Sequence, residues 1–347
     1  MRALRLVEER RLALASLPEP PAPEGDQVVV RMQALALNHI DVWGHRGMAF
    51  ARRQLPLTVG VEGAGTIAAI GPGVSGLAPG QRVVIYPALI CGTCRACRAG
   101  QETLCGSIGG ILGFHRDGLA AELVAVPARL VIPVPDGIDW PAAACATVTV
   151  ATVEHMLVDN ARLQPGETIL VQAGGSGVGS TAILLAKRIG ARVIATAGSD
   201  EKVARILALG ADHAINYRTH RFEGEVRRLT AKRGVDVVFE HVGPDTWVGS
   251  LLSLARGGRL VTCGSTSGVS APTNLMQVYQ QQIRIIGSFG GTMRNVRAGL
   301  ARMAAGDMRP VIDSEIALAD YADGLARLES RAVFGKIIVR IPGEPQA

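Results

Sequence analysis

Aromatic residues are scarce in this sequence, and it has no apolar run long enough to suggest a membrane span. Phe, Tyr and Trp make up 4% of the 347 residues and are not interleaved with Lys and Arg, so the net charge of +6 gives no sign of a nucleic-acid-binding surface. The longest apolar stretch, 141–153, ends at Glu154 and is too short to cross a bilayer. We therefore expect neither a nucleic-acid partner nor a membrane.

A secretion signal is also missing at the N-terminus. The apolar residues there are interrupted by four charged residues at 8–11, whereas a signal peptide needs an unbroken apolar core. We therefore expect a cytoplasmic protein, in which thiols stay reduced. With 48% hydrophobic and 19% charged residues the chain is globular, and 347 residues are enough for two domains with separate cores.

Short apolar, β-branched segments fill the first third of the chain. Segments 27–38, 63–71 and 81–87 are separated by Gly and Pro, and no long amphipathic helix interrupts them. This pattern predicts a compact β-rich domain.

The pattern changes beyond Cys145. From Gly166 onward, buried strand-like segments alternate with helix-like segments, beginning with a strand at 168–173 and a helix at 181–190. Alternation of this kind predicts a doubly wound parallel sheet. The last apolar segment, 334–341, reads as a further strand that can return to the first domain.

The turn after the first of these strands is rich in glycine. Gly174 allows a tight turn, Gly177 lets the backbone approach a pyrophosphate, and Gly179 permits close packing of helix on strand. Backbone N–H groups at the helix start, around Val178, can bind phosphate. Ser176 replaces the middle glycine of the usual motif, so the match is partial. The turn predicts a dinucleotide site, and a tight turn without a nucleotide is the alternative.

The end of the second strand lacks the acidic residue that binds the ribose 2′-hydroxyl in most NAD sites. Ala197 stands there, and the first acidic residue beyond it is Asp200. Small residues leave room for a 2′-phosphate, which Ser199 and Lys202 could bind, while Tyr217 could border the adenosine. The sequence therefore favours NADPH, although Lys202 can equally be a solvated lysine.

Four of the six cysteines, Cys91, Cys94, Cys97 and Cys105, lie within fifteen residues. Their spacing brings four thiolates together on a short loop, which suits tetrahedral Zn²⁺. A disulfide or free thiols are the alternatives.

Several segments together resemble the zinc-containing medium-chain dehydrogenases/reductases, and among them the quinone oxidoreductase and alkenal/enoyl reductase branch. Besides the glycine turn and the cysteine loop, these segments are 36–43, 59–84, 198–217, 237–243, 258–268 and 334–339. The resemblance covers nearly the whole chain. It implies an α/β protein with a chaperonin-10-like β-rich catalytic domain and a Rossmann domain, assembled as a homodimer or homotetramer.

The resemblance also implies domain boundaries and a role for the zinc. We expect the β-rich catalytic domain at 1–145 and 291–347, with a zinc-binding lobe at about 87–106, and the Rossmann domain at 146–290. In the family the four-cysteine site is closed and structural. One zinc ion per chain, with no open coordination position for a substrate, should therefore not catalyse.

Alcohol dehydrogenases of this family hold a second, catalytic zinc, and the resemblance places its ligand positions here. Asn38 replaces the first cysteine, and Val61 replaces the histidine of the Gly-His-Glu motif. Only Cys145 is kept, with Glu62 beside Val61. Ile40 stands in place of the hydroxyl that relays the alcohol proton. The sequence therefore predicts no catalytic zinc.

A site without a catalytic metal favours reduction of a conjugated C=C bond. Hydride transfer to a ketone makes a strongly basic alkoxide, which usually needs a Lewis acid. Hydride transfer to an enone makes a delocalised enolate, for which one or two neutral hydrogen bonds can suffice. We expect Asn38 and the nicotinamide ribose to donate them.

Other residues are assigned through the same resemblance. Trp43 can form an apolar wall for the substrate or be a core residue, and Asp41 can orient His39 or Asn38. His39 can contact the pyrophosphate, and Thr149 can pack beside the nicotinamide.

Residues at strand ends should also line the cofactor, because ligands in a doubly wound fold lie beyond the carboxyl ends of the strands. These residues are Val242, Gly243, Cys263, Gly264, Ser265, Ser288, Phe289 and Gly290.

Three functions remain open at this point. The leading one is an NADPH-dependent reductase of 2-alkenals, enones, enoyl thioesters or quinones. The others are an alcohol or aldehyde dehydrogenase with an atypical metal site, and a non-catalytic NADPH-binding protein.

Overall fold

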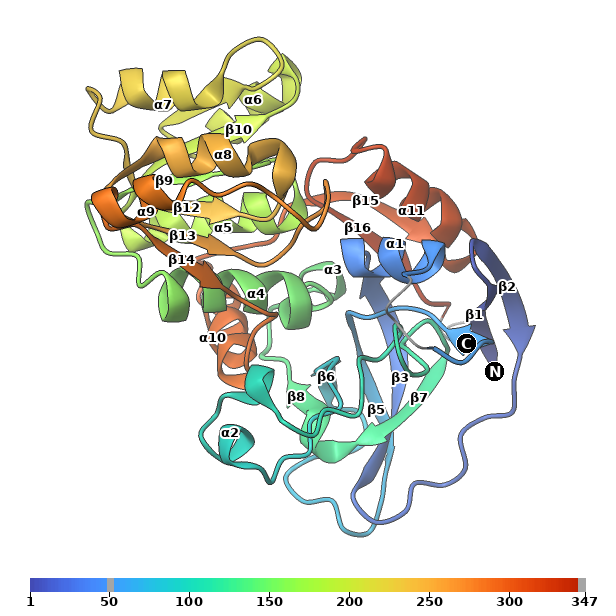
Figure 1. Ribbon diagram of the computed structural model, residues 1–347. Coiled ribbons are helices and arrows are strands. Elements are labelled where there is room, and N and C mark those ends of the chain that lie inside the picture. The colour runs from blue at the N-terminus through green and yellow to red at the C-terminus, as the bar shows by residue number, and fades with distance from the viewer. Residues whose placement is uncertain (49–52, 343–347) are drawn as a thin grey trace. The chain divides into compact units, whose positions relative to one another are not determined.

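A computed structural model of the protein describes residues 1–48 and 53–342 (Figure 1). The chain divides into two compact units. The first comprises Met1–Thr149, Thr292–Ala305 and the described part of Ile312–Ala347, and the second comprises Val150–Gly291 and Gly306–Val311. Residues 291 and 306–311, which we expected in the first domain, group with the second, and residues 146–149, which we expected in the second, group with the first.

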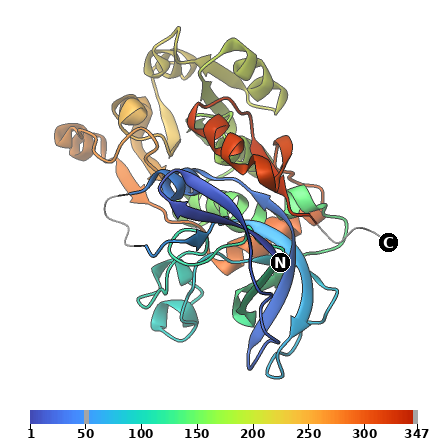
Figure 2. The ribbon, with the colours of Figure 1, turned by 90° about the vertical axis from the view of Figure 1, so that its right-hand side faces the viewer.

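Within residues 1–48 and 53–342, ten strands belong to the first unit. They are β1 (Arg2–Glu8), β2 (Arg11–Ser16), β3 (Gln27–Ala36), β4 (Leu57–Thr58), β5 (Gly63–Ile70), β6 (Arg82–Ile85), β7 (Leu123–Pro127), β8 (Val131–Pro133), β15 (Ile312–Ala317) and β16 (Lys336–Arg340). One sheet has the order β15-β16-β3-β5-β6-β8, with β7 also paired to β3, and a smaller sheet has the order β2-β1-β4. Figure 2 shows the long paired strands β3 and β5 in blue and light blue.

The core of the first unit follows from the alternation of apolar side chains along these strands. Val28, Val30 and Met32 of β3 point to one face and are fully buried with Ile67 and Ile337. The β-rich domain that the sequence predicts, with its chaperonin-10-like fold, is confirmed.

The last strand, β16, returns to this unit as the sequence suggested. It pairs antiparallel with β3, with Ile338 opposite Ala36. Because the register continues, Lys336 at the start of β16 lies near Asn38, just beyond the end of β3. This pairing joins two parts of the chain about three hundred residues apart.

Short helices complete the first unit. They are α1 (His39–Arg46), α2 (Arg95–Arg98), α3 (Trp140–Ala143), α10 (Met293–Ala304) and α11 (Tyr321–Glu329), with 3₁₀ turns at Glu102–Leu104, Ala128–Leu130 and Leu318–Asp320 and a π-helical turn at Ala146–Val150. Asn38 is the N-cap of α1, and its backbone N–H donates to the Asp41 side chain three residues later.

The second unit is a six-stranded parallel sheet in the order β11-β10-β9-β12-β13-β14. Its strands are β9 (Thr168–Val171), β10 (Arg192–Ala197), β11 (His213–Asn216), β12 (Val235–Glu240), β13 (Leu254–Thr262) and β14 (Arg284–Gly287). Counted along the chain this is the order 3-2-1-4-5-6 of a Rossmann fold. The predicted doubly wound parallel sheet is confirmed.

Helices connect the strands of the second unit. They are α4 (Ala151–Glu154) with a π-helical turn at His155–Asn160, α5 (Gly177–Ile189), α6 (Asp200–Ala208), α7 (Phe222–Leu229), α8 (Pro244–Ser253) and α9 (Leu275–Gln281). Among the residues that the structure describes, no helix has the length and apolar character needed to cross a membrane.

Candidate functional site

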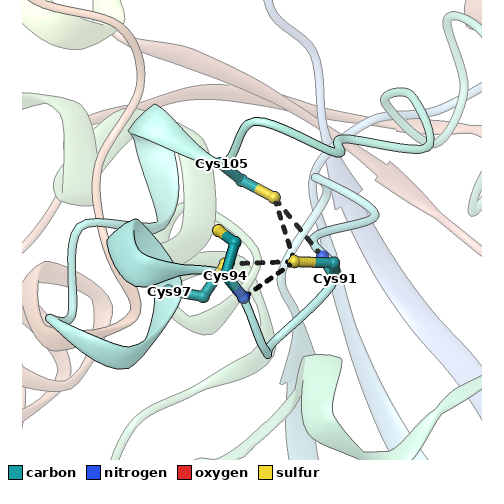
Figure 3. A group of neighbouring side chains, drawn as sticks. All are labelled: Cys91, Cys94, Cys97 and Cys105. Atoms are coloured by element: carbon teal, nitrogen blue, oxygen red, sulfur yellow. Dashed lines mark hydrogen bonds between the residues drawn. The ribbon is translucent and has the colours of Figure 1, made fainter.

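The cysteine loop forms a compact group of four sulfur atoms (Figure 3). All four Sγ atoms lie within 4.8 Å of one another. Cys91 Sγ is 3.9 Å from Cys97 Sγ and 3.6 Å from Cys105 Sγ. A ZnS₄ tetrahedron with Zn–S bonds of about 2.3 Å has S···S edges of about 3.8 Å. The four cysteines form a structural zinc site, as the sequence predicts.

The backbone of the loop favours thiolates at Cys91 and Cys94, where backbone hydrogen bonds lower the pKa. The N–H of Cys94 donates to Cys91 Sγ over 3.3 Å, and the N–H of Cys91 approaches Cys105 Sγ at 3.5 Å. Hydrogen bonds from the backbone N–H groups of Thr93 and Cys94 lower the pKa of Cys91 to about 6. Four protein ligands leave no open position, so zinc held here stabilises the loop and does not meet a substrate.

The glycine turn lies between β9 and α5. Ser176 is the N-cap of α5, and its Oγ accepts from Gly179 N over 2.9 Å. A Cβ added at Gly179 would lie 2.3 Å from the Ala173 carbonyl oxygen, so only glycine fits there. The left-handed residue of the turn is Ala173, with φ 46°, rather than Gly174. At Gly174 the constraint is space, because an added Cβ would lie 2.9 Å from Ile206.

This geometry leaves the first turn of α5 open to an anion. Gly177 and Val178 are its first two residues, and their N–H groups have no carbonyl to bond within the helix. The dipole of a thirteen-residue helix adds positive potential at that end. The turn can therefore hold the pyrophosphate of a dinucleotide.

The end of β10 is crowded by residues that follow β11. Tyr217 packs against Gly198, where an added Cβ would lie 2.6 Å from the tyrosine oxygen, and Arg218 Nε lies 3.5 Å from the same point. Ser199 is the N-cap of α6 and accepts from Lys202 N. The sequence singled out Ser199, Lys202 and Tyr217 of these residues, but not Arg218.

The remaining strand-end residues gather at the carboxyl ends of β12, β13 and β14. The buried Glu240 carboxylate accepts from Val242 N (2.7 Å) and Gly243 N (3.1 Å), which shapes the first of these ends. Cys263, Gly264 and Ser265 follow β13, and Ser288, Phe289 and Gly290 follow β14. Ser288 Oγ accepts from Asn160, and the Phe289 ring is exposed.

A buried polar cluster in the first unit joins Asn38, Glu62 and Lys336. Asn38 Nδ2 donates to Glu62 Oε2 and to the Ala36 carbonyl, both over 2.9 Å. Lys336 Nζ donates to Asn38 Oδ1 over 2.7 Å, to the Leu37 carbonyl over 2.6 Å and to Glu62 Oε2 over 3.3 Å. Because an ammonium can only donate, these contacts fix which end of the Asn38 amide faces Lys336.

Glu62 also anchors the start of the π-helical turn. Its Oε1 accepts from Val148 N (2.6 Å) and Thr149 N (2.8 Å), and its Oε2 accepts from Thr149 Oγ1 (3.0 Å). Glu62 and Thr149 are both fully buried. Thr149, which the sequence suggested as a nicotinamide contact, is thus held in place by Glu62.

Asp41 lies on the other side of Asn38. Its Oδ2 accepts from Asn38 N over 2.9 Å, and its Oδ1 accepts from the buried hydroxyl of Tyr321 over 3.0 Å. Burial raises the pKa of Asp41 to about 6, more than these hydrogen bonds and the nearby Lys336 charge lower it.

The other residues singled out in this part of the sequence lie around the cluster. Cys145 is fully buried and donates to the Pro141 carbonyl, and burial raises the pKa of its thiol well above the usual range. Val61 is a buried apolar side chain. The half-buried Trp43 meets the His39 ring edge-on, with centroids 6.4 Å apart.

Comparison with known proteins agrees with this geometry. Residues 24–136 match the model of the alcohol dehydrogenase GroES-like domain, and residues 177–305 match that of the zinc-binding dehydrogenases. An acryloyl-coenzyme A reductase of Metallosphaera sedula is 32% identical, over 92% of this chain and 94% of that protein. The chain belongs to the zinc-binding medium-chain dehydrogenase/reductase superfamily. It is therefore an NAD(P)-dependent oxidoreductase.

Other relatives of this medium-chain oxidoreductase carry a different activity in their names. An NAD-dependent alcohol dehydrogenase of Saccharolobus solfataricus is 31% identical, over 98% of this chain and 99% of that protein. A crystal structure described as an NAD-dependent alcohol dehydrogenase is 40% identical, with a TM-score of 0.94, over 99% of this chain and all of that one. Both reduction of an enoyl thioester and oxidation of an alcohol thus occur among its relatives.

Sequence reasoning missed Lys336 of the buried cluster in this oxidoreductase, and it missed Tyr321, which bonds Asp41 beside the cluster. Lys336 opens a strand whose next three residues are fully buried and apolar, and a lysine in that position was a signal of a buried charge. Tyr321, the first residue of α11, left no such signal.

Proposed function

We propose that the protein reduces an activated C=C bond, of a 2-alkenal, enone or enoyl thioester, or else a quinone, with NADPH and without a catalytic zinc. The buried cluster around Asn38 carries this proposal. At the positions where alcohol dehydrogenases of the family hold the metal, this chain has the amide of Asn38 and the apolar Val61, and the retained Glu62 is occupied by hydrogen bonds. An amide and an apolar side chain do not make a Zn²⁺ site.

The chemistry needs a hydride donor and a site for developing negative charge. When bound, NADPH would supply a hydride to the β-carbon of the substrate. Negative charge would then develop on the carbonyl oxygen as an enolate, and a proton from water would complete the reduction at the α-carbon. What the protein must provide is hydrogen-bond donation to that oxygen and correct orientation.

Asn38 is our candidate donor, although both Nδ2 hydrogens are engaged in the structure. One of them binds Glu62 Oε2, which also accepts from Thr149 Oγ1 and Lys336 Nζ. A substrate oxygen can therefore share that N–H with Glu62 while the amide keeps its orientation, because two other donors still satisfy Glu62. Catalytic hydrogen bonds often form fully only in the substrate complex.

The preference for NADPH rests on the end of β10. A carboxylate at Ala197 would repel a 2′-phosphate, and none is there. Ser199, Lys202 and Tyr217 remain candidates for this phosphate, and Arg218 beside Gly198 adds a guanidinium suited to it. His39, Thr149 and the strand-end residues remain our candidates for other cofactor contacts, and Trp43 for substrate packing.

Alcohol or aldehyde oxidation is the second candidate. The names of two relatives favour it, as does the retention of Cys145 and Glu62. Against it, the Cys145 thiol is fully buried and bonded to a backbone carbonyl.

We also propose a homodimer, or a homotetramer, in the cytoplasm. Among the residues that the structure describes, none pairs with the outer edge of β14, the last strand of the second unit's sheet. Ile285 on this strand and Phe289 after it are 40% and 58% exposed. A second copy of the chain on this edge would pair the strand and would bury the two exposed apolar side chains. A reducing compartment suits the six unpaired cysteines.

A substrate screen tests the proposed reaction. NADPH consumption is followed with enals, enones, enoyl-coenzyme A esters and quinones, and NADP⁺ or NAD⁺ reduction with simple alcohols. We expect turnover with at least one conjugated acceptor and none with alcohols. Robust oxidation of ethanol or benzyl alcohol would replace the proposal with the second candidate.

A further inference from the structure

We propose that Lys336 is the fixed cation of the active site. Its ammonium group takes the place of a divalent metal among the oxygen atoms of Leu37, Asn38 and Glu62, and it holds the Asn38 amide ready for the substrate. The inference rests on the proposed function, in which the site has no catalytic zinc. Lys336 would then supply the positive charge of that site.

The hydrogen bonds of Lys336 are complete. An ammonium has three N–H donors, and the structure gives them three oxygen acceptors at 2.6, 2.7 and 3.3 Å. The lysine side chain is 4% exposed, and its carboxylate partner is fully buried. The protein therefore fixes the position of the Lys336 ammonium group, unlike that of a mobile lysine at the surface.

A divalent metal does not fit beside this ammonium. It would need the same Asn38 and Glu62 oxygen atoms, and it would be repelled by the lysine charge. The nearby sulfur offers little compensation, since the Cys145 thiol donates to Pro141. Asn38, Glu62 and Lys336 therefore do not fit a second zinc of the kind that alcohol dehydrogenases of the family contain.

Lys336 can act on the reaction through Asn38. Donation to Asn38 Oδ1 polarises the amide and strengthens its N–H groups as donors. The same contact fixes the amide orientation, so that Nδ2 faces away from the ammonium. Lys336 is thus a positioning residue: it meets Asn38 and Glu62, and Asn38 would meet the substrate.

Charge rescue separates this role from simple packing. Lys336→Ala removes three methylene groups and the ammonium, which propylammonium can replace in the space left behind. Using whichever substrate the wild type turns over, we expect kcat to fall on the order of 10²-fold. Propylammonium should restore kcat in a saturable manner, and 1-propanol, of the same length but uncharged, should not. Lys187→Ala, which removes a lysine paired at the surface with Asp212, is the matched control and should keep kcat.

Three results with Lys336→Ala would contradict its proposed role. Equal rescue by propanol, no rescue by the ammonium, or an unchanged kcat in Lys336→Ala would overturn the inference. If Lys336→Ala does not fold, Lys336→Met keeps the packing and loses only the charge. It should then lose kcat to a similar extent while NADPH affinity stays normal, and full activity of Lys336→Met would overturn the inference.

A metal titration gives a second readout on the wild type alone. With the zinc loop filled, excess Co²⁺ should produce no further thiolate-to-cobalt absorption. Uptake of one more Co²⁺ per chain with Lys336 in place would contradict the inference. The substrate screen tests the proposed reaction separately. If the protein oxidises alcohols and does not reduce conjugated acceptors, the proposed reaction is wrong, whatever the propylammonium experiment shows for Lys336.

Discussion

At the scale of single residues, Asn38 is the point where the structure adds most to the sequence. The sequence identified it as a replaced metal ligand. It could not show that both amide hydrogens are engaged and that Lys336 holds the amide oxygen, since both facts depend on contacts with residues distant in the chain. The cluster around Asn38 is therefore satisfied, and the proposed mechanism requires Asn38 to share one of its N–H groups with the substrate.

Replacing Asn38 tests its role as that donor. Asn38→Ala should lower kcat on the order of 10²-fold and change KM much less, because the hydrogen bond strengthens as enolate charge develops. The measurement is steady-state kinetics with the conjugated substrate. An unchanged NADPH Kd and melting temperature serve as controls for folding. A loss confined to KM would mean that Asn38 only helps to bind the substrate.

Asp41 predicts a pH dependence of stability. Its pKa is raised from 3.8 to about 6 by burial, so the folded state holds this proton more firmly than the unfolded state. The resulting stability is fully present below pH 3.8 and is lost as pH rises through about 6. The loss amounts to roughly 3 kcal/mol.

The variant Asp41→Asn isolates this effect. Its amide can accept from Asn38 N and donate to the Tyr321 oxygen without titrating. Between pH 4 and 7, the free energy of unfolding of the wild type should fall relative to that of Asp41→Asn, as measured by urea unfolding at each pH. Protonation of the zinc loop affects both proteins and cancels in the difference. Parallel curves for the two proteins would show that Asp41 ionises normally.

At the scale of elements, local patterns were sufficient where neighbours along the chain decide the structure. The glycine turn, the cysteine loop and the alternating strands and helices depend on short-range spacing, and the fold was predicted from them. The sequence only suggested that the last strand returns to the first domain. It could not predict the register of β16 on β3, because the two strands are distant in the chain. That register is what places Lys336 beside Asn38.

The end of β10 carries the prediction on cofactor choice. Ala197→Asp should shift preference from NADPH toward NADH, since a carboxylate repels the 2′-phosphate and accepts from the 2′-hydroxyl. Binding titrations with both cofactors measure the ratio of the two Kd values, which we expect to change by at least tenfold. Ala68→Asp, on an exposed position of β5, introduces the same charge elsewhere and should leave the ratio unchanged. Equal affinities for NADH and NADPH in the wild type would argue against the proposed preference.

The zinc loop predicts a dependence of folding on metal. Cys97→Ser should lose the zinc and much of the soluble protein, because binding of a structural metal is part of the folding free energy. Cys263→Ser, which changes a cysteine outside the loop, should retain one zinc per chain. The measurements are zinc content by elemental analysis and the yield of soluble protein, compared between the two variants. A Cys97→Ser protein that folds normally without zinc would show that the metal is dispensable.

At the scale of the whole molecule, family membership and reaction type are separate questions. The relatives include an acryloyl-coenzyme A reductase at 32% identity and alcohol dehydrogenases at 31% and 40% identity, and identity of this order does not decide which reaction this protein catalyses. In our proposal the choice depends on a few side chains around Asn38, where a lysine and an amide replace a catalytic metal.

The zinc content of fully active enzyme tests this account most directly. The purified protein is dialysed against a chelator that leaves the structural site intact, and zinc per chain and NADPH-dependent turnover are then measured on the same sample. We predict one zinc per chain and undiminished reduction of the conjugated substrate. Two zinc ions per chain, with activity lost in step with removal of the second, would contradict the account.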